Sequence, residues 1–569
     1  MKLNMDPTAW PAGEYEMGLA EQMVMRSEAG YAEGATGAVT VAYGSLAARA
    51  GIQALKSGGT AIDAALTTAM MQIVLTAGAP ISFFGIQSLV YYEAKTGKVH
   101  CMNAEWNTVR GEDDPMTIPG GFDLATGMSG LKGKGPASGR TALVGGFLKG
   151  VESAHRRFGK LPFHALFDPS IHAAATGVPV NRDLALAYSL RAEDLGRLPE
   201  TASTLKKPDG SVYELGESLK QPALARTLRA VATLGADYIY RGPWAEKLVA
   251  AVRADGGHMT LEDLAQYEVI WSDALEAKVG EYEVRTSPPP NAGGVALVEA
   301  QLLARASGLA SEAHWTESGS SLRKAVQIAQ MYILDYLPEA ARQAIYPGME
   351  FSPATRLTPE HAQDLWKRME AGAVPFQFAN PRHSDDVVAI DSEGNIAAIT
   401  HTSNTVLWGK TAINIDGISI PDSASFQQSL IARVTPGSRL PAPTETGIVF
   451  KGGKPILGFA SMGSGLHHRT MQALLNVTAH KMSLREAVNT PDFFGCKMDP
   501  ATGALTMQVP KGKFSTRVLE ESGLPFVEIE SAEARFGSEG IWIGIQRDPE
   551  TGWLQAVSHN RNNSGAFAY

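Results

Sequence analysis

The stretch from His383 to Thr405 is the feature that most constrains how this chain folds, because it reads as two β-strands joined by a tight turn. Residues 387–390 (VVAI) form a β-rich apolar run, and residues 391–395 (DSEGN) are turn-forming types. Residues 396–402 (IAAITHT) supply a second strand. The pattern therefore predicts a β-hairpin.

Length and composition place the chain among large globular proteins. It has 569 residues, of which 44% are hydrophobic and 19% charged. The chain can therefore form a large hydrophobic core, and its composition is not that of a disordered protein. The net charge of −9 argues against a basic surface that binds nucleic acid. Cys101 and Cys496 are the only two cysteines, too few for a disulfide framework, so we expect two buried reduced thiols.

The sequence carries no signal for membrane insertion or export. The first residues, MKLNMDPTAWPAGEYEMGLAEQ, lack an apolar core and contain several acids, so we expect no signal peptide and a cytoplasmic protein. The most apolar run, at 64–81, is interrupted by Thr67, Thr68 and Gln72 and ends in Gly-Ala-Pro. This pattern favours a buried core helix over a membrane span.

Motifs for metal and phosphate chemistry are missing from the sequence. It has no HExxH pattern and no clustered Cys/His spacing, so we expect neither a metal nor another cofactor. The run WGKT at 408–411 resembles a phosphate loop, but Asn404 stands where that loop needs glycine. Gly463-Ser464-Gly465 is one residue too short for a Gly-x-Ser-x-Gly elbow.

Two blocks of sequence carry a specific pattern. The first is A-G-x-x-x-L-x-x-G-G-x-A-x-D-A-A, present from Ala50 to Ala65, where apolar residues at helical spacing flank a Gly58-Gly59 break. The second is formed by Ser384, Asp391, Gly394, Asn395, Thr400, Thr402, Asn404 and Thr405. Together the two blocks resemble the γ-glutamyltransferase family of N-terminal-nucleophile hydrolases, whose nucleophile block the second block matches in spacing. The family nucleophile is Thr, whereas this chain has Ser. The resemblance extends from about residue 37 to about residue 560.

This resemblance implies a fold and a processing event. The fold would be an α+β four-layer αββα sandwich, in which two mainly antiparallel sheets lie between helix layers. A precursor would cleave itself between His383 and Ser384. Residues 1–383 would become the large subunit, with 1–36 a surface segment, and residues 384–569 the small subunit. The two would remain together as an αβ heterodimer forming one sandwich, and whether the heterodimers pair further is left open.

The resemblance also implies a catalytic set. Ser384 would be the nucleophile, and its freed α-amino group, with an ordinary pKa of about 8, would serve as the base that a serine hydroxyl requires. Thr402 would orient the nucleophile, and Asn404 would contact the substrate. Backbone amides at Gly463 and Ser464 would form an oxyanion hole at the start of a helix near Leu466.

The glutamyl pocket of the family is altered in this chain. Glu105, with Trp106 beside it, occupies the place of an Arg that holds the glutamyl carboxylate, and two carboxylates repel each other once desolvated. Ala442 and Pro443 replace a pair of serines, although Thr444 is close, and Asp422 is the one candidate to bind a substrate amino group.

We therefore expect a self-processing amidohydrolase that cleaves a small-molecule amide through an acyl-Ser384 intermediate and is not specific for γ-glutamyl groups. One alternative is a glutathione hydrolase or γ-glutamyltransferase. Another is an unprocessed, non-catalytic member with a binding role. None of these functions requires a nucleic acid or a membrane as partner.

Overall fold

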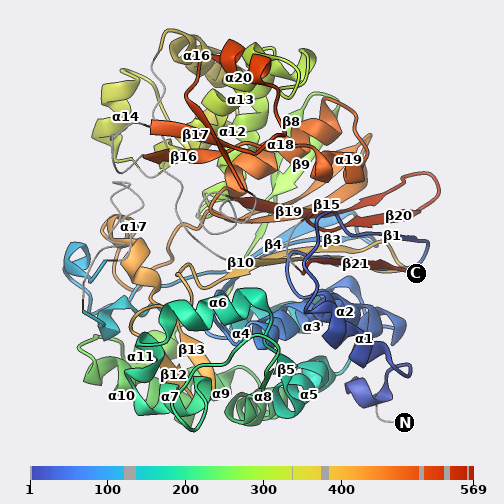
Figure 1. The fold of residues 1–569 in the computed structure, drawn as a ribbon. Helices are drawn as coiled ribbons and strands as arrows, with labels where there is room; N and C mark the ends of the chain where they lie inside the picture. Colours follow the sequence, from blue (N-terminus) through green and yellow to red (C-terminus); the bar gives the residue numbers. More distant parts are fainter. Residues whose placement is uncertain are drawn as a thin grey trace.

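The computed structural model describes residues 3–120, 136–335, 337–372, 384–498, 505–530, 539–560 and 563–569. Its centre consists of two seven-stranded antiparallel sheets that lie face to face (Figure 1). We call the first the nucleophile sheet, because it contains Ser384, the predicted nucleophile. In spatial order its strands are β21 (Gly565–Ala568), β2 (Ala38–Val41), β10 (Ser384–Ile390), β11 (Ile396–Thr402), β3 (Ile86–Glu93), β4 (Lys98–Ala104) and β7 (Ile270–Asp273).

The second sheet, which we call the facing sheet, also combines strands from distant parts of the chain. In spatial order they are β1 (Tyr31–Gly34), β20 (Leu554–Val557), β19 (Gly540–Arg547), β15 (Lys454–Gly463), β14 (Glu445–Lys451), β9 (Tyr282–Thr286) and β8 (Leu275–Val279). Both sheets therefore contain strands from before and after Ser384. The two halves of the chain form one structure.

An apolar core fills the space between the sheets. Val388 and Ile396 of the nucleophile sheet pack there with Ile448 and Ile543 of the facing sheet, and none of these side chains is exposed. Strands β10 and β11 are buried along their whole length, as expected for strands covered on both faces.

Helices cover the outer face of each sheet, which completes the four layers (Figure 1). Over the nucleophile sheet lie α2 (Ser45–Lys56), α3 (Ala61–Leu75), α4 (Phe147–Phe158), α5 (Asp168–Thr176), α8 (Pro222–Leu234) and α10 (Pro243–Ala254). Over the facing sheet lie α12 (Gly293–Ala306), α13 (Gly319–Gln330), α16 (Pro359–Glu370), α18 (Leu466–Thr478), α19 (Leu484–Asn489) and α20 (Thr516–Ser522). The predicted α+β αββα sandwich is confirmed.

The local predictions are confirmed closely. The hairpin forms as β10 and β11, and α2 and α3 flank Gly58, whose φ of +85° needs glycine. The segment 3–36 contains α1 (Glu14–Glu21), which packs on α2, and β1, which pairs with β20.

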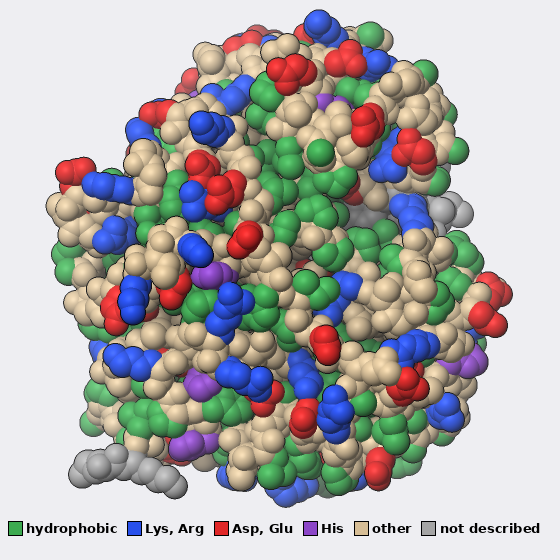
Figure 2. Space-filling model, turned by 180° about the vertical axis from the view of Figure 1, so that it is seen from behind, with side chains coloured by type: hydrophobic (Ala, Val, Ile, Leu, Met, Phe, Trp, Pro, Cys, Tyr) green, Lys and Arg blue, Asp and Glu red, His purple; other side chains and the backbone are tan. Residues whose placement is uncertain are grey.

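The described surface carries charges of both signs. On the face shown in Figure 2, Lys and Arg are interspersed with Asp and Glu rather than gathered in one basic patch. Among the described residues, no helix is both long and apolar enough to cross a membrane. The same residues contain no group of three or more His, Cys, Asp or Glu side chains arranged to hold a metal ion.

Candidate active site

Ser384 is the first residue of β10, and its direct partner across the hairpin is Thr402, the last residue of β11. Both are buried, with exposed fractions of 8% and 2%. Side chains of directly paired residues lie on the same face of a sheet, so the two hydroxyl groups are neighbours. His383, and with it the predicted scissile bond, lies outside the described residues.

Asn404 lies two residues beyond Thr402 and is linked to it. The Asn404 amide N–H donates to Thr402 Oγ1 at 2.9 Å, and the backbone of Asn404 is left-handed, with φ of +47°. The side-chain nitrogen Nδ2 of Asn404 is buried and donates to no atom of the described chain. A buried donor without an acceptor is costly, so a bound carbonyl oxygen at this position would satisfy it.

The hydroxyl groups of Ser384 and Thr402 face the second sheet. Thr400 lies on the same side of β11 as Thr402, since alternate residues of a strand share a face. Its Oγ1 donates to Asp386 Oδ1 at 2.6 Å and approaches Ser461 O, in β15 of the facing sheet, at 3.4 Å. Ser384 therefore lies between the two sheets, at the end of both hairpin strands.

Gly463 and Ser464 lie at the same end of the sandwich. A Cβ added at Gly458 would lie 2.6 Å from Ile396 Cγ2, and Ser461 faces Thr400, so β15 and β11 run in the same direction. The end of β15 at Gly463 is thereby near the end of β11. Gly463 has φ of +88°, and a Cβ there would meet Glu539 O at 2.7 Å, which requires glycine.

The turn after Gly463 presents backbone amides at a helix start. The Gly465 N–H donates to Glu539 O at 3.1 Å, whereas the Ser464 N–H donates to no atom within the described ranges. Helix α18 begins directly afterwards, at Leu466. An unpaired amide next to a helix N-terminus is suited to stabilise a developing negative charge.

Glu105 follows β4 and is completely buried. Its Oε1 accepts from Thr444 Oγ1 at 3.1 Å and from Asn291 Nδ2 at 3.2 Å, and also from the Ser88 hydroxyl. Its Oε2 accepts from Asn103 Nδ2 at 3.0 Å. Burial raises the pKa of Glu105 above its ordinary value, although these hydrogen bonds oppose the rise. The structure thus brings Glu105 and Thr444 into contact.

A small polar cavity adjoins Glu105. Its volume of about 20 Å³ has room for a single water. Its lining includes Ser88, Asn103, Ser287 and Asn291, and the Ser287 hydroxyl is buried without a hydrogen bond to the described residues.

Trp106 belongs to an apolar cluster that we call the acyl-side cluster. Ile86, another member, is the direct strand partner of Thr402, so the cluster reaches the end of β11. Its remaining buried members are Ile118, Leu143, Ala296, Tyr332, Ala424, Phe426, Leu430, Ile431, Leu440 and Ala442. An acyl group attached to Ser384 could lie against this surface.

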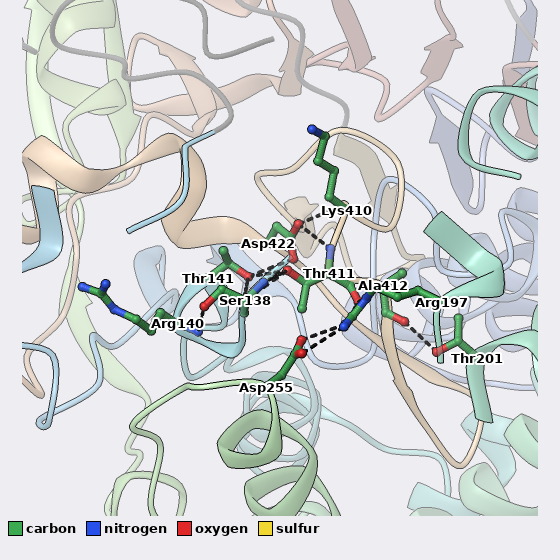
Figure 3. A network of polar contacts seen from close by, with 10 residues as sticks. All are labelled: Ser138, Arg140, Thr141, Arg197, Thr201, Asp255, Lys410, Thr411, Ala412 and Asp422. Atoms are coloured by element: carbon green, nitrogen blue, oxygen red, sulfur yellow. Dashed lines mark hydrogen bonds and ion pairs between the residues drawn. The ribbon is translucent and has the colours of Figure 1, made fainter. Parts of the chain in front are cut away.

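Asp422 occupies a different network, which ties a loop to the helix layer (Figure 3). Its Oδ1 accepts from Thr141 Oγ1 at 2.9 Å, and its Oδ2 accepts from the amides of Lys410 at 2.6 Å and Thr411 at 2.9 Å. Burial raises the pKa of Asp422, and these donors oppose the rise. Both carboxylate oxygens thus already have partners within the chain.

Three buried titratable groups beside Ser384 were not predicted from the sequence. Asp386 faces the second sheet, whereas Asp385 and His401 are cross-strand partners on the opposite face, where His401 Nε2 lies 2.9 Å from Gln72 Oε1. Burial raises the pKa of both Asp385 and Asp386 well above the ordinary range and lowers that of His401 to about 3. The alternation of β10 and β11 could have assigned these faces.

A buried pair, Glu445 and His467, was also missed. His467 Nδ1 and Glu445 Oε1 are 2.5 Å apart, and the adjacent His468 points elsewhere, with Nε2 3.3 Å from Gln330 Nε2. The two histidines therefore point in different directions, as adjacent residues on a helix do.

Comparison with known proteins identifies the family. Residues 47–569 match the family model described as Gamma-glutamyltranspeptidase. This chain belongs to the gamma-glutamyltranspeptidase family. It is an enzyme of the N-terminal-nucleophile type, an amide hydrolase or acyltransferase.

Relatives in the gamma-glutamyltranspeptidase family cover most of this chain. The "Glutathione hydrolase proenzyme" of Bacillus subtilis (strain 168) is 26% identical over 576 residues, covering 94% of this chain and 92% of that protein. The "Acylase ACY 1 proenzyme" of Pseudomonas sp. (strain SE83) is 26% identical over 477 residues, covering 78% and 80%. The crystal structure of cephalosporin acylase from Bacillus halodurans shares the fold, with a TM-score of 0.76 at 22% identity, covering 100% of this chain and 99% of that one.

Proposed function

We propose that this protein is a self-processing amidohydrolase that uses Ser384 as its N-terminal nucleophile. The observation that carries the proposal is the direct pairing of Ser384 with Thr402 at the end of the hairpin, next to the Asn404 side-chain nitrogen Nδ2, which has no partner among the described residues. Cleavage between His383 and Ser384 would leave two chains held together by strands from both halves in both sheets.

The proposed reaction proceeds in two steps. The Ser384 hydroxyl attacks the substrate carbonyl carbon while its proton passes to the Ser384 α-amino group. The resulting oxyanion is stabilised by backbone amides at Gly463 and Ser464. The C–N bond then breaks, the α-ammonium group returns a proton to the leaving amine, and an acyl-Ser384 ester remains. Water adds to this ester and releases the carboxylic acid, or an amine takes the acyl group.

The proposed substrate is a small amide whose acyl group is not γ-glutamyl. Glu105 stands at the position of the family's carboxylate-binding Arg, and its carboxyl group engages Thr444, Asn291 and Ser88. An anionic acyl end placed here would meet a buried acid in place of the family's Arg. The acyl-side cluster, including Trp106, favours an acyl group with an apolar portion.

A second candidate function is glutathione hydrolysis, which the printed names of several relatives favour. Incubation of the purified, cleaved protein with a panel of small amides, including a γ-glutamyl anilide, tests both. We expect turnover of some neutral or cationic acyl amides, lost in Ser384→Ala. Turnover that survives in Ser384→Ala would exclude Ser384 as the nucleophile.

A further inference from the structure

A cavity lies on the helix side of the nucleophile sheet, where β2 ends and β10 begins. Its walls come from residues 43–44, the C-terminal part of α3, α6 (Arg182–Arg191) and the loop after β11. Its volume is about 70 Å³. One water needs about 10–15 Å³ and a cavity of about 150 Å³ holds benzene, so this cavity has room for roughly three or four non-hydrogen atoms.

Asp385 brings a buried carboxyl group to this cavity. Alternate residues of β10 point to opposite faces, so the Asp385 side chain lies on the helix side and that of Ser384 between the sheets. Asp385 Oδ1 accepts from the amides of Asp386 at 2.9 Å and Tyr43 at 3.1 Å. Asp385 Oδ2 is buried and has no hydrogen-bond partner among the described residues. A buried polar atom of this kind requires a partner, which a ligand in the cavity could supply.

Gln72, which also lines the cavity, is not available as that partner. Its Nε2 donates to Tyr43 O at 3.0 Å and to Asp386 O at 3.1 Å. Its Oε1 lies 2.9 Å from His401 Nε2. These contacts fix both ends of the Gln72 amide group, so it cannot turn toward Asp385 without losing them.

Most of the remaining wall is apolar. Asp183 is the other charged residue of the described lining, which contains no Lys or Arg, so an anion is disfavoured here. Asp183 and Thr76 are partly exposed, and the cavity is not closed to solvent. The buried apolar residues of the wall are Leu75, Ala79, Leu184, Ala187 and Leu407.

We propose that this cavity binds a small molecule with a short apolar body and one hydroxyl group, which forms a hydrogen bond with Asp385 Oδ2. Burial raises the pKa of Asp385 and so favours its protonated form. A hydroxyl group can accept from the protonated acid and donate to the ionised one, so it fits either state. The sheet would separate this ligand from an acyl group on Ser384. The site is therefore additional to the substrate site of the proposed function and does not depend on it.

Methyl NMR spectra of the whole protein, with isotope labels in the Ala and Leu methyl groups, test the site. Four probes share a three-carbon chain: 1-propanol, 1-chloropropane, propylammonium and propionate. With 1-propanol we expect saturable shifts of the methyl signals of Leu75, Leu184 and Ala187. Propylammonium and propionate should bind at least about fivefold more weakly, because a charge would have to enter a mainly apolar cavity.

Substitutions of Asp385 test the hydrogen bond itself. Asp385→Val should lower the affinity for 1-propanol relative to 1-chloropropane by about fivefold to tenfold, the effect of one hydrogen bond. Asp385→Asn should keep most of this preference, because its side-chain amide can donate to the hydroxyl oxygen. Asp386→Val, the same substitution on the opposite face of β10, is the matched control and should leave the preference unchanged.

A second variant keeps the test decisive if Asp385→Val does not fold. Ala187→Leu places a larger side chain in the cavity and should weaken the binding of 1-propanol and 1-chloropropane alike. Undiminished binding in folded Ala187→Leu would contradict the site, as would an unchanged preference in folded Asp385→Val. In the wild type, the absence of saturable shifts, or tighter binding of propylammonium or propionate than of 1-propanol, would also overturn the inference.

Binding is measured without substrate, in the wild type and in Ser384→Ala, which separates this inference from the proposed function. A protein that binds 1-propanol as described but turns over no amide would refute the proposed function and leave the site standing. An active enzyme without such binding would refute the site alone.

Discussion

Ser384 and Thr402 are direct cross-strand partners at the open ends of β10 and β11, with their side chains toward the second sheet. A strand that starts at the proposed nucleophile has a functional consequence. Cleavage before Ser384 would create an α-amino group on the residue that carries the attacking hydroxyl, next to the hydroxyl of Thr402. Nucleophile, base and orienting group would then occupy one strand end.

Thr402→Val should slow turnover or maturation by about tenfold or more while the fold stays intact. Loss of one neutral hydrogen bond costs about 0.5 to 1.5 kcal/mol, and more when a buried partner is stranded. The Asn404 amide, which donates to Thr402 Oγ1, would be such a partner. Thr402→Ser keeps the hydroxyl and should retain most activity. Wild-type kinetics in Thr402→Val would show that Thr402 does not orient the nucleophile.

Gly463→Ala should reduce kcat strongly, whereas Ser464→Gly should be tolerated. The added Cβ would meet Glu539 O at 2.7 Å in a left-handed backbone, so the turn that presents the Ser464 amide must shift. Loss of one oxyanion donor typically costs about a hundredfold to a thousandfold in kcat. Steady-state kinetics of the two variants with one amide would measure the difference. Similar kcat values for Gly463→Ala and the wild type would place the oxyanion site elsewhere.

A γ-glutamyl anilide should be turned over at least about a thousandfold less efficiently than the best amide of a panel. The reason is that Glu105, whether ionised or protonated, provides no positive charge for the glutamyl carboxylate, and that hydroxyl donors are lost at Ala442 and Pro443; these effects together amount to several kcal/mol. The alternative is that Arg110 replaces the family's Arg, although its guanidinium is engaged 3.6 Å from Glu262 at the surface. Efficient γ-glutamyl turnover that is abolished by Arg110→Ala would contradict the altered pocket.

Asp386→Asn should stabilise the fold increasingly as the pH rises. Burial raises the folded-state pKa of Asp386 above the unfolded value of about 3.9. The stability linked to this proton is therefore complete below about pH 4 and is lost as the pH rises through the folded pKa. The asparagine side chain of the variant cannot ionise, so the difference in free energy of unfolding between variant and wild type should grow by at most about 1.4 kcal/mol per pH unit.

Urea unfolding at a series of pH values, in a Ser384→Ala background that keeps the chain uncleaved, measures this difference. The exposed Asp113→Asn serves as control. If the free energy of unfolding changes with pH in the same way for Asp386→Asn in this background and for Ser384→Ala alone, Asp386 does not resist ionisation in the folded protein.

Local spacing predicted the hairpin that follows Ser384, and the family resemblance implied that Thr402 lies beside Ser384. The turn at 391–395 sets the register of the hairpin, and the same register pairs Ile390 with Ile396 and Ser384 with Thr402. The glycine break between α2 and α3 is equally local. These features depend on residues that are close together in the chain, so they can be predicted from the sequence alone.

The surroundings of Glu105 and the pairing of His467 depend on contacts that the sequence does not display. Glu105 is held by side chains from other segments, among them Thr444, 339 residues away, and His467 meets Glu445 across a strand and a helix. Their positions follow from the packing of the two sheets and the helix layer. Sequence spacing does not encode that packing.

Intact mass spectrometry of the purified protein tests the central claim most directly. Cleavage before Ser384 would divide the 569 residues into chains of 383 and 186, and scaling 60.6 kDa by length gives about 41 and 20 kDa. The smaller chain should begin with Ser384, and Ser384→Ala should remain a single inactive chain. An active enzyme that stays one chain, or one whose small chain begins at another residue, would contradict the proposed mechanism.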